Sequence, residues 1–505
     1  MNLPAKNYLQ NSPGSVFDET LVTYECGDND EYLTPAGTPH HVASTLHRYL
    51  SSLSHNQLLQ QQHELQTNIS YHPVSSADAQ TTDSLRNQWS LDPLPHVINH
   101  DQWQGVQQGI IQRIDALNLF IEDIHADQHI LNDNVLPEKL LTKLSQQYLS
   151  SRRSTPNDHP PANNDKLVWA STDVIRDSEG NYRVSGNNLH NPGNVAYMLA
   201  NRQLLKNASS TPFADSASFA DSSVLPIDDI TTHLRDSLTA LSPNNTARIG
   251  LLINGSDSPR YAQFSYLARQ LGALLVESRD LFISSAEGFL YADTIDQSQR
   301  LDVVLICSDD PNNDMCAHDP HALMDVPGLL SCWNDGKVAL ANAPQTRLAS
   351  NPMVLSYMPE LINYYLNQKM ILPAITSYRC DDDHALAYVL DHMDELVITG
   401  SNDKGKISSF KAGLASREEK QRMFKRINDQ PYNFVASPVP TMSTAPTVSN
   451  NGLQPQSVTV TAYSVHGTEP YVTNGGVTRL GAGTNTTATD STRSQHTKDT
   501  WVIEC

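Results

Sequence analysis

Apolar residues recur three or four positions apart in two segments of the first third of the chain, residues 34–66 and residues 103–131. This spacing places apolar side chains on one face of a helix, so both segments are predicted to form amphipathic helices. The chain is therefore expected to begin with helices. The recurring residues are Val42, Leu46, Leu50 and Leu53 in the first segment, and Val106, Ile110, Ile114, Leu117 and Ile121 in the second.

The pattern changes to that of strands after residue 165. The segments KLVWASTDVIRD and NYRV flank a Gly180-Asn181 turn and are predicted to pair. From about residue 247, the apolar runs RIGLLIN and VVLIC alternate with helical segments such as YAQFSYLARQLGALL, which is typical of a parallel α/β layer. After residue 431, SVTVTAYSV alternates with period two and KDTWVIE follows it, so a β-rich C-terminal part is expected.

Polar connectors separate these blocks. Residues 151–165 are polar and proline-rich and residues 209–223 are serine-rich, so we expect a surface linker and an exposed insertion. We divide the chain into a helical N-terminal region at 1–150, a central α/β domain at 166–345 and a C-terminal part at 346–505. The predicted fold class is α/β, with α+β character overall.

The charge balance narrows the classes of partner. The 505 residues include 34 lysines and arginines against 55 aspartates and glutamates, which gives a net charge of -21. This acidity argues against nucleic acid or an anionic membrane as a partner. No stretch reaches the roughly 18 apolar residues of a spanning helix, and the start MNLPAKNYLQNS lacks a secretory signal, so a cytoplasmic protein is expected.

Neither the cysteines nor the histidines predict a metal centre. The cysteines have no CxxC spacing, which favours buried thiols over a disulfide framework or a zinc site. His125 and His129 lie four positions apart on a predicted helix, the spacing of two ligands on one face, but no third ligand can be named. No metal is therefore expected. The cysteines are Cys26, Cys307, Cys316, Cys332, Cys380 and Cys505.

Several longer segments resemble, in the same order, those of one known family. They are LNLFIEDIHADQHILNDNVLP, TDVIRDSEGNYRVSGNNLHNPGNVAYMLANR, YAQFSYLARQLGALLVESRDL, VPGLLSCWNDGKVALANAP, YMPELINYYLNQKMILP, GGVTRL and KDTWVIE. From about residue 30 to its last residue, the chain resembles the circularly permuted ATP-grasp family, type 2, which is related to glutathionylspermidine-synthetase-like enzymes.

The resemblance implies a circularly permuted ATP-grasp fold, with residues 346–505 as the ATP-grasp-like part. It also implies a chemistry in which ATP and magnesium activate a carboxylate as an acyl phosphate, which an amine attacks to form an amide bond. Phosphates require close backbone N–H groups and cations, and magnesium requires carboxylate or amide oxygens. The residues at the family's ligand positions therefore indicate whether that chemistry is retained.

This chain departs from the family pattern at most of those positions. The lysine of the phosphate loop is replaced by Thr399, and the glycine-rich run reads SNDKGK, with Gly405 as its one glycine. The metal-handling stretch, usually Glu-Asp-Asn and an arginine, reads Gly186, Asn187, Asn188 and His190. The other departures are Pro352 for a second lysine, Cys307 and Ser308 for an arginine pair, Ala436 and Ser437 for Gln-Glu, Gln456, Thr459 and Thr461 for an arginine, an aspartate and an arginine, and Asp490 for an asparagine.

The residues that the chain keeps are mainly those that a fold requires, among them Asn342, Gly475, Gly476 and Trp501. No catalytic residue is assigned. Arg202 and Lys498 can equally belong to structural ion pairs, because such networks are common. The best remnant of a ligand pocket consists of Asn188, Arg202, Lys404, Lys406, Arg479, Lys498 and Asp499.

Two functions are consistent with this pattern. The first is a non-catalytic paralogue, a pseudoenzyme without cofactors, that binds a small molecule or a protein partner. The resemblance suggests an active ATP-grasp paralogue, a helical protein or a transglutaminase-like protein as that partner. The alternative is an active carboxylate–amine ligase that uses ATP and magnesium, with missing groups supplied by a partner or by Lys404, Lys406 and Asp490. The combined departures favour the first, because one such charge typically contributes about 3 kcal/mol to transition-state stabilisation.

Overall fold

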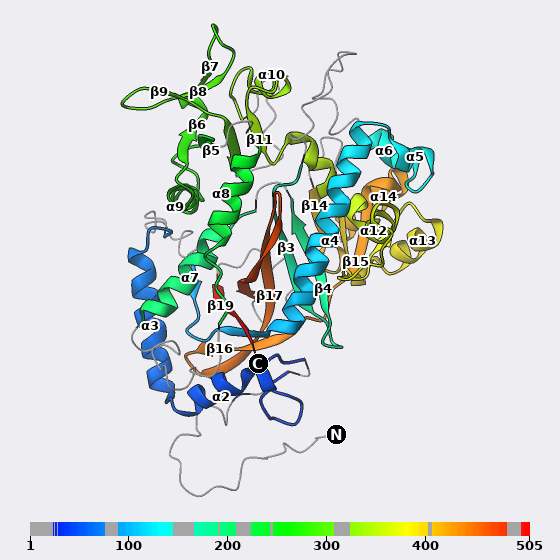
Figure 1. Ribbon diagram of the computed structural model, residues 1–505. Helices are drawn as coiled ribbons and strands as arrows, with labels where there is room; N and C mark the ends of the chain where they lie inside the picture. Colours follow the sequence, from blue (N-terminus) through cyan, green and yellow to red (C-terminus); the bar gives the residue numbers. More distant parts are fainter. Residues whose placement is uncertain are drawn as a thin grey trace, which may run out of the picture.

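The computed structural model describes most of the chain and arranges it around three larger sheets (Figure 1). The predicted linker at 151–165 and insertion at 209–223 lie outside the described residues, as do Lys404, Lys406 and Asp490. The described residues are 24, 26–27, 29–75, 89–144, 166–189, 192–208, 224–242, 246–307, 324–401, 407–481 and 496–504.

The main sheet has eight strands drawn from distant parts of the sequence. Its centre is the long strand β17, which pairs antiparallel with both β18 and β3. The predicted hairpin around Gly180 and the predicted strands near the C-terminus are confirmed. In order, the strands are β1 (Ser90–Leu91), β19 (His496–Ile503), β18 (Pro470–Leu480), β17 (Gly452–His466), β3 (Trp169–Arg176) and β4 (Tyr182–Asn188), with β16 (Thr444–Ser449) on β17 and β2 (His96–Asn99) on β19.

Period-two alternation along β17 gives the main sheet two apolar faces. Val460 and Ala462 pack in the core that contains the apolar stripe of α4, the second predicted helix. Tyr463 and Val465 pack in the core formed with α7, α8 and α9. The pairing of β17 with β18 also shifts in register between Ala462 and Ser464. The helices are α4 (His100–His125), α7 (Val195–Asn207), α8 (Ile230–Ala240) and α9 (Tyr261–Leu271).

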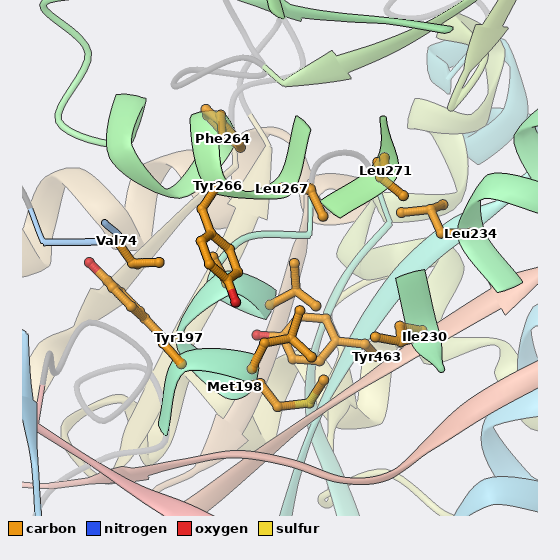
Figure 2. Packing of buried hydrophobic residues seen from close by; sticks show 14 of the residues in the cluster. Val74, Tyr197, Met198, Ile230, Leu234, Phe264, Tyr266, Leu267, Leu271 and Tyr463 are labelled. Carbon is orange, nitrogen blue, oxygen red and sulfur yellow. The ribbon is translucent and has the colours of Figure 1, made fainter. Parts of the chain in front are cut away.

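Figure 2 shows the second of these cores. Tyr463 of β17 lies among Met198 of α7 and Ile230 of α8, and the side chains of Leu234 and Leu267 complete the layer. All five residues are buried. Burying side chains of this size stabilises the fold by about 2 kcal/mol each, so these helices are fixed to the sheet mainly by apolar contact.

The second sheet is the predicted parallel α/β layer, with the strand order β11, β10, β5 and β6. All of its pairings are parallel, and β5 and β10 are buried along their whole length, as their uninterrupted apolar runs require. A small three-stranded sheet projects beside it (Figure 1). The strands are β5 (Ile249–Ile253), β6 (Leu274–Glu277), β10 (Val303–Cys307) and β11 (Ala339–Ala341), and in the small sheet β7 (Leu281–Ile283), β8 (Leu290–Asp293) and β9 (Ser298–Arg300).

The third sheet is antiparallel, has the strand order β12, β15, β13 and β14, and lies with its helices in the yellow and orange region of Figure 1. Its own core holds the buried side chains of Ile398, Phe434 and Ile427. The strands are β12 (Tyr378–Arg379), β13 (Leu396–Ser401), β14 (Ile407–Lys411) and β15 (Phe434–Pro438), and the nearby helices are α11 (Pro352–Ser356), α12 (Met358–Leu366), α13 (Asp383–Asp391) and α14 (Arg417–Asp429). The helix α10 (Leu329–Asn334) packs instead against the parallel layer.

The predicted helical start at 34–66 is confirmed and is divided into α2 (Ser44–Ser51) and α3 (His55–Tyr71). The Ser54 side chain accepts a hydrogen bond from the backbone N–H of Gln57, whose side chain bonds back to the Ser54 backbone. This reciprocal cap starts a new helix at that point. Two short helices, α5 (His129–Asn132) and α6 (Glu138–Leu144), follow α4.

The side chain of Asn342 joins the parallel layer to the main sheet. Its Oδ1 accepts hydrogen bonds from the backbone N–H groups of Val168 at 2.9 Å and Trp169 at 3.0 Å. Its Nδ2 donates to the carbonyl oxygens of Trp169 and Leu189. Because this amide is buried, each of these bonds satisfies a group that would otherwise be desolvated without a partner.

Across the described part of the chain, no helix combines the length and apolar character needed to cross a membrane.

Candidate functional site

A cavity of about 340 Å³ lies where β4 of the main sheet meets α11 and the third sheet. Its walls consist of serine and threonine hydroxyls, apolar side chains and proline rings. Examples are Ser185, Ser356, Ser409, Leu355, Ile375 and Val435. A space of this size, with mixed hydroxyl and apolar walls, suits a small organic molecule.

The cavity brings together residues that are far apart in the sequence and that replace the family's ligand groups. Gly186 and Asn187 come from β4, Pro352 from α11, Thr399 from β13 and Ser437 from β15, and all five line the cavity. The sequence comparison assigned to these positions a glutamate, an aspartate, two lysines and another glutamate. The fold therefore places these five replaced positions around one space, whereas Cys307, Thr459 and Thr461 lie outside its lining.

The strand register explains how Thr399 and Ser437 reach that space. Val397 pairs with Ser437, and Thr399 lies two residues further along β13, on the same face of the third sheet. Thr399 pairs with Ser409 on β14, and their hydroxyl oxygens are 3.0 Å apart. Because the two hydroxyls bond to each other, this wall of the cavity needs no charged group to satisfy them.

The helix α11 provides the opposite wall, and its start is fixed by a local cap. The Asn351 side chain accepts a hydrogen bond from the backbone N–H of Met353 at 2.9 Å. Pro352 occupies the first helical position, where its fixed φ suits the helix and its missing N–H is not needed. The lysine expected at this position is thus replaced by a residue that serves the helix start.

A carboxylate lies next to the cavity but is already engaged. Asp173 of β3 pairs in register with Gly186, and a Cβ on Gly186 would lie 3.1 Å from an Asp173 side-chain oxygen. The other oxygen, Oδ1, accepts a hydrogen bond from the Thr461 hydroxyl and lies 3.8 Å from Arg479 Nη1. Arg479, a predicted remnant residue, therefore belongs to a polar group beside β4 rather than to the cavity lining.

Arg113 is the one charged residue among the described residues that line the cavity, and the sequence analysis did not single it out. It lies on α4 and is 2% exposed. A signal was present in the sequence, because Arg113 directly precedes Ile114 and follows Ile110 by three positions, which places it on the apolar face. A charged residue on the buried stripe of a helix is unusual and marks a site for inspection.

Three other predicted pocket residues form buried ion pairs. Arg202 Nε donates to Asp499 Oδ2 at 2.6 Å, and Lys498 Nζ lies 2.7 Å from Asp92 Oδ1. Burial lowers the pKa of Lys498, with Asp92 acting in the opposite direction, and burial raises the pKa of Asp499 against the effect of Arg202. These side chains fix β19 to its neighbours and are not among the cavity-lining residues.

The last predicted pocket residues are not brought to the cavity by the described structure. Asn188 is exposed at the end of β4 and pairs with Ser171 of β3. Lys404 and Lys406 lie outside the described residues.

The predicted spacing of His125 and His129 on one helix does not occur. His125 ends α4 and His129 begins α5, and Gln128 between them has the left-handed φ of 55°. The ring of His129 lies 3.1 Å from Asp123, a carboxylate that also accepts backbone hydrogen bonds. Within the ranges that the structure describes, no group of three or more histidine, cysteine or acidic side chains could hold a metal ion.

A buried polar cluster near the start of the described chain involves Glu31, His96 and Ser443. His96 Nε2 lies 2.9 Å from Glu31, Ser443 donates to the other Glu31 oxygen, and Arg176 Nη1 lies 3.8 Å from Glu31. Burial opposes ionisation, but these partners outweigh it and lower the pKa of Glu31 to about 2. Ser443 and His96 both bind the carboxylate rather than each other, so the cluster is an ion-pair anchor and not a nucleophile with its base.

The relationship of this chain to known proteins agrees with the geometry. Residues 95–481 match the family described as circularly permuted ATP-grasp type 2. The chain belongs to this family. The predicted membership and the predicted α/β fold class, a circularly permuted ATP-grasp fold, are thereby confirmed.

Relatives of known sequence extend the match to almost the whole chain. An uncharacterized protein of Synechocystis sp. is 32% identical, with 96% of this chain and 99% of that protein covered. An uncharacterized protein of Mycobacterium tuberculosis is 31% identical, with 84% and 76% covered. A protein of Frankia casuarinae named as a putative glutamate–cysteine ligase is 24% identical over 83% of this chain and 47% of its own length.

Among solved structures, the chain is similar to a glutathione synthetase-like effector from Globodera pallida in its apo form. The TM-score is 0.48 and the sequence identity is 12%, with 84% of this chain and 93% of that chain covered. For this circularly permuted ATP-grasp protein, the lining of the cavity supplies the basis for a proposal about its activity.

Proposed function

We propose that this protein is a non-catalytic member of the ATP-grasp family, which binds a small molecule or a protein partner instead of joining a carboxylate to an amine. One observation carries the proposal. Five of the positions at which the family's cations and carboxylates are expected converge on one cavity, and there they hold Gly186, Asn187, Pro352, Thr399 and Ser437.

The neutral lining does not fit a magnesium–triphosphate complex. Magnesium prefers carboxylate oxygens and phosphates prefer cations and close backbone N–H groups. The described lining residues include no carboxylate and one cation, Arg113. Asp173 beside the cavity is engaged by Thr461 and Arg479, so recruiting it for a metal would leave a buried arginine without its partner.

The energetic consequence is large. Removing one group that stabilises developing charge typically lowers the rate by a factor that corresponds to about 3 kcal/mol. Several such groups are replaced here, and even with incomplete additivity the remaining rate would be far below that of an ordinary ligase.

The alternative, an active ligase with relocated groups, has its own support. The Frankia relative carries the name of a putative ligase. Lys404 and Lys406 also belong to the segment between β13 and β14, and Thr399 and Ile407 of these strands line the cavity. These lysines are the candidates for relocated cations.

Thermal unfolding of the purified protein with and without Mg-ATP tests the proposal. We expect no rise in melting temperature at millimolar Mg-ATP, because a nucleotide at a hundredfold excess over its dissociation constant would stabilise the fold by about 2.7 kcal/mol. We also expect no release of ADP with panels of carboxylic acids and amines. ADP release that depends on both substrates, and that disappears in a variant with Lys404→Ala and Lys406→Ala, would establish the ligase instead.

A further inference from the structure

We propose that the cavity binds an organic monocarboxylate, with the carboxylate paired to the Arg113 guanidinium and a neutral body held by the hydroxyl and apolar walls. This ligand class rests on the proposed non-catalytic function. It differs from the family's nucleotide, because it requires one cation and no metal.

The Arg113 side chain is buried and has no acidic partner among the described residues. It is 2% exposed, and its Nη1 makes two long contacts, 3.4 Å to the carbonyl oxygen of Leu372 and 3.7 Å to the sulfur of Met370. Its Nε is buried without a hydrogen-bond partner. No carboxylate of the described residues lies within 4.0 Å of the guanidinium nitrogens. Every other buried arginine or lysine discussed above has an acidic partner.

The Arg113 guanidinium keeps its positive charge in this buried position. Burial lowers the pKa of the Arg113 guanidinium to about 10, so the side chain still carries a positive charge at neutral pH. A buried charge without a counter-ion is unfavourable by several kcal/mol, whereas a carboxylate offers two oxygens that match the fork of the guanidinium. An anion in the cavity would therefore complete an ion pair that the protein leaves open.

The single cation and the neutral walls of the cavity favour a carboxylate over other anions. One guanidinium balances one negative charge, and a carboxylate carries one, whereas a phosphate monoester carries between one and two at pH 7. The described lining residues include no acid to receive an ammonium group, which disfavours free amino acids. The walls combine hydroxyls such as Ser185 and Ser356 with apolar side chains such as Leu355 and Ile375, which suits a neutral hydroxylated or aromatic body.

A panel of ligands in pairs tests the proposal by thermal unfolding and calorimetry. Aromatic and short aliphatic monocarboxylates, such as 4-hydroxybenzoate, are compared with their amides, such as 4-hydroxybenzamide, and with phenyl phosphate and inorganic phosphate. At millimolar concentration, we expect at least one carboxylate to raise the melting temperature and to bind about tenfold or more tightly than its amide, because a hydrogen bond to a charged group is lost in the amide.

Variants of the protein separate binding from folding. Arg113→Gln is expected to lose the preference for carboxylate over amide, and Arg113→Lys to retain part of it, because it keeps the charge but not the fork. Ser437→Phe fills the cavity without altering Arg113 and is expected to abolish binding. Arg417→Gln, at an exposed arginine of α14, serves as the control and is expected to bind as the unaltered protein does.

The outcomes distinguish this inference from the proposed function. If no carboxylate stabilises the protein, if phenyl phosphate alone does so, or if Arg113→Gln and Ser437→Phe bind as the unaltered protein does, the carboxylate site is refuted. The non-catalytic function is then untouched. Substrate-dependent ADP release would refute the non-catalytic function and the ligand class that rests on it.

Discussion

The side chains that fix β19 are charged and paired, whereas the described lining of the cavity beside β4 is almost entirely neutral. Lys498 and Asp92 are fully buried and bonded to each other, and Arg202 and Asp499 form a second such pair. Around the cavity, by contrast, the described lining holds neutral residues and the single charge of Arg113. Charged side chains therefore occur in bonded pairs where they hold β19 to its neighbours, whereas the described cavity wall is almost entirely neutral.

The comparison teaches that a retained charge in an ATP-grasp sequence is not in itself a sign of a retained site. Lys498 and Asp499 are adjacent in the sequence, and their side chains bond to different neighbours, Asp92 and Arg202. Alternation along a strand sends consecutive side chains to opposite faces of a sheet. A short charged motif can thus anchor a strand on both faces without meeting a ligand.

The largest expected change in stability comes from breaking the buried ion pair of Lys498 and Asp92. Lys498→Met should destabilise the protein by about 3–5 kcal/mol, because it leaves Asp92 buried without its partner. Urea unfolding followed by circular dichroism measures this loss. The double variant Lys498→Met with Asp92→Leu should recover most of it, since apolar replacement of both partners is often nearly neutral. Equal stability of the single and double variants would contradict the ion-pair interpretation.

Acid should lower the free energy of unfolding by protonating Glu31, another buried and paired carboxylate. Its pKa in the folded protein is about 2, below its ordinary value of 4.5, so its contribution is complete above pH 4.5 and is lost as the pH falls toward 2. A shift of this size corresponds to about 3 kcal/mol. Unfolding free energies measured between pH 7 and pH 3 should therefore converge for the unaltered protein and Glu31→Gln.

The control for this pH dependence is Glu122→Gln, at an exposed position of α4. It should follow the unaltered protein at every pH. A difference between Glu31→Gln and the unaltered protein that stays constant from pH 7 to pH 3 would show that ionisation of Glu31 is not the cause.

Gly476 in the main sheet and Gly186 at the cavity allow the same substitution to be compared in the two regions. A Cβ on Gly476 in β18 would lie 2.0 Å from the backbone oxygen of Thr461, whereas a Cβ on Gly186 would lie 3.1 Å from the side chain of Asp173. Gly476→Ala should destabilise the protein by about 2–3 kcal/mol, because the paired strands must separate. Gly186→Ala at the cavity should cost less than about 1 kcal/mol. Equal melting temperatures for the two variants would contradict the expectation that Gly476 is more tightly packed than Gly186.

The smallest effect on stability is expected when a cation is returned to the cavity. Thr399 is partly exposed at the cavity wall, so Thr399→Lys should change the unfolding free energy by less than about 0.5 kcal/mol. It should nevertheless give ATP binding that calorimetry detects, where the unaltered protein gives none, because the added ammonium makes a charged contact to phosphate. ADP release should stay absent, because the carboxylates for magnesium are not restored.

Thr142→Lys, at an exposed position of α6, is the matched control for added charge. An equal gain in ATP affinity at Thr142 would show a nonspecific effect of charge rather than a phosphate site at Thr399.

The fold was largely predictable because its elements carry clear periodicities. The alternation of SVTVTAYSV, the apolar runs of RIGLLIN and VVLIC, and the turn at Gly180 correspond to β17, β5, β10 and the β3–β4 hairpin. The division between α2 and α3 was readable too, since Ser54 and Gln57 have the spacing of a reciprocal cap. Local pattern and tertiary structure agree at these places.

The site was only partly predictable, because it depends on contacts between distant strands. The replaced positions such as Thr399 and Pro352 could be found one by one, but their convergence on one cavity required the fold. The burial of Arg202 and Lys498 could not be read from charge, and Arg113 was overlooked because its helix fitted an apolar stripe without it. A sequence pattern shows the neighbours of a residue within its own helix or strand, but it does not show which other helices and strands contact that residue.

The amide of Asn342 has a consequence for how such a protein can change over generations. Its side-chain oxygen accepts from two backbone N–H groups and its nitrogen donates to two carbonyl oxygens, so one side chain bonds the end of β11 to the main sheet. Aspartate would offer no donor there and leucine neither donor nor acceptor. A substitution at Asn342 would therefore leave buried backbone groups at this junction without partners, so the position constrains how the sequence can change.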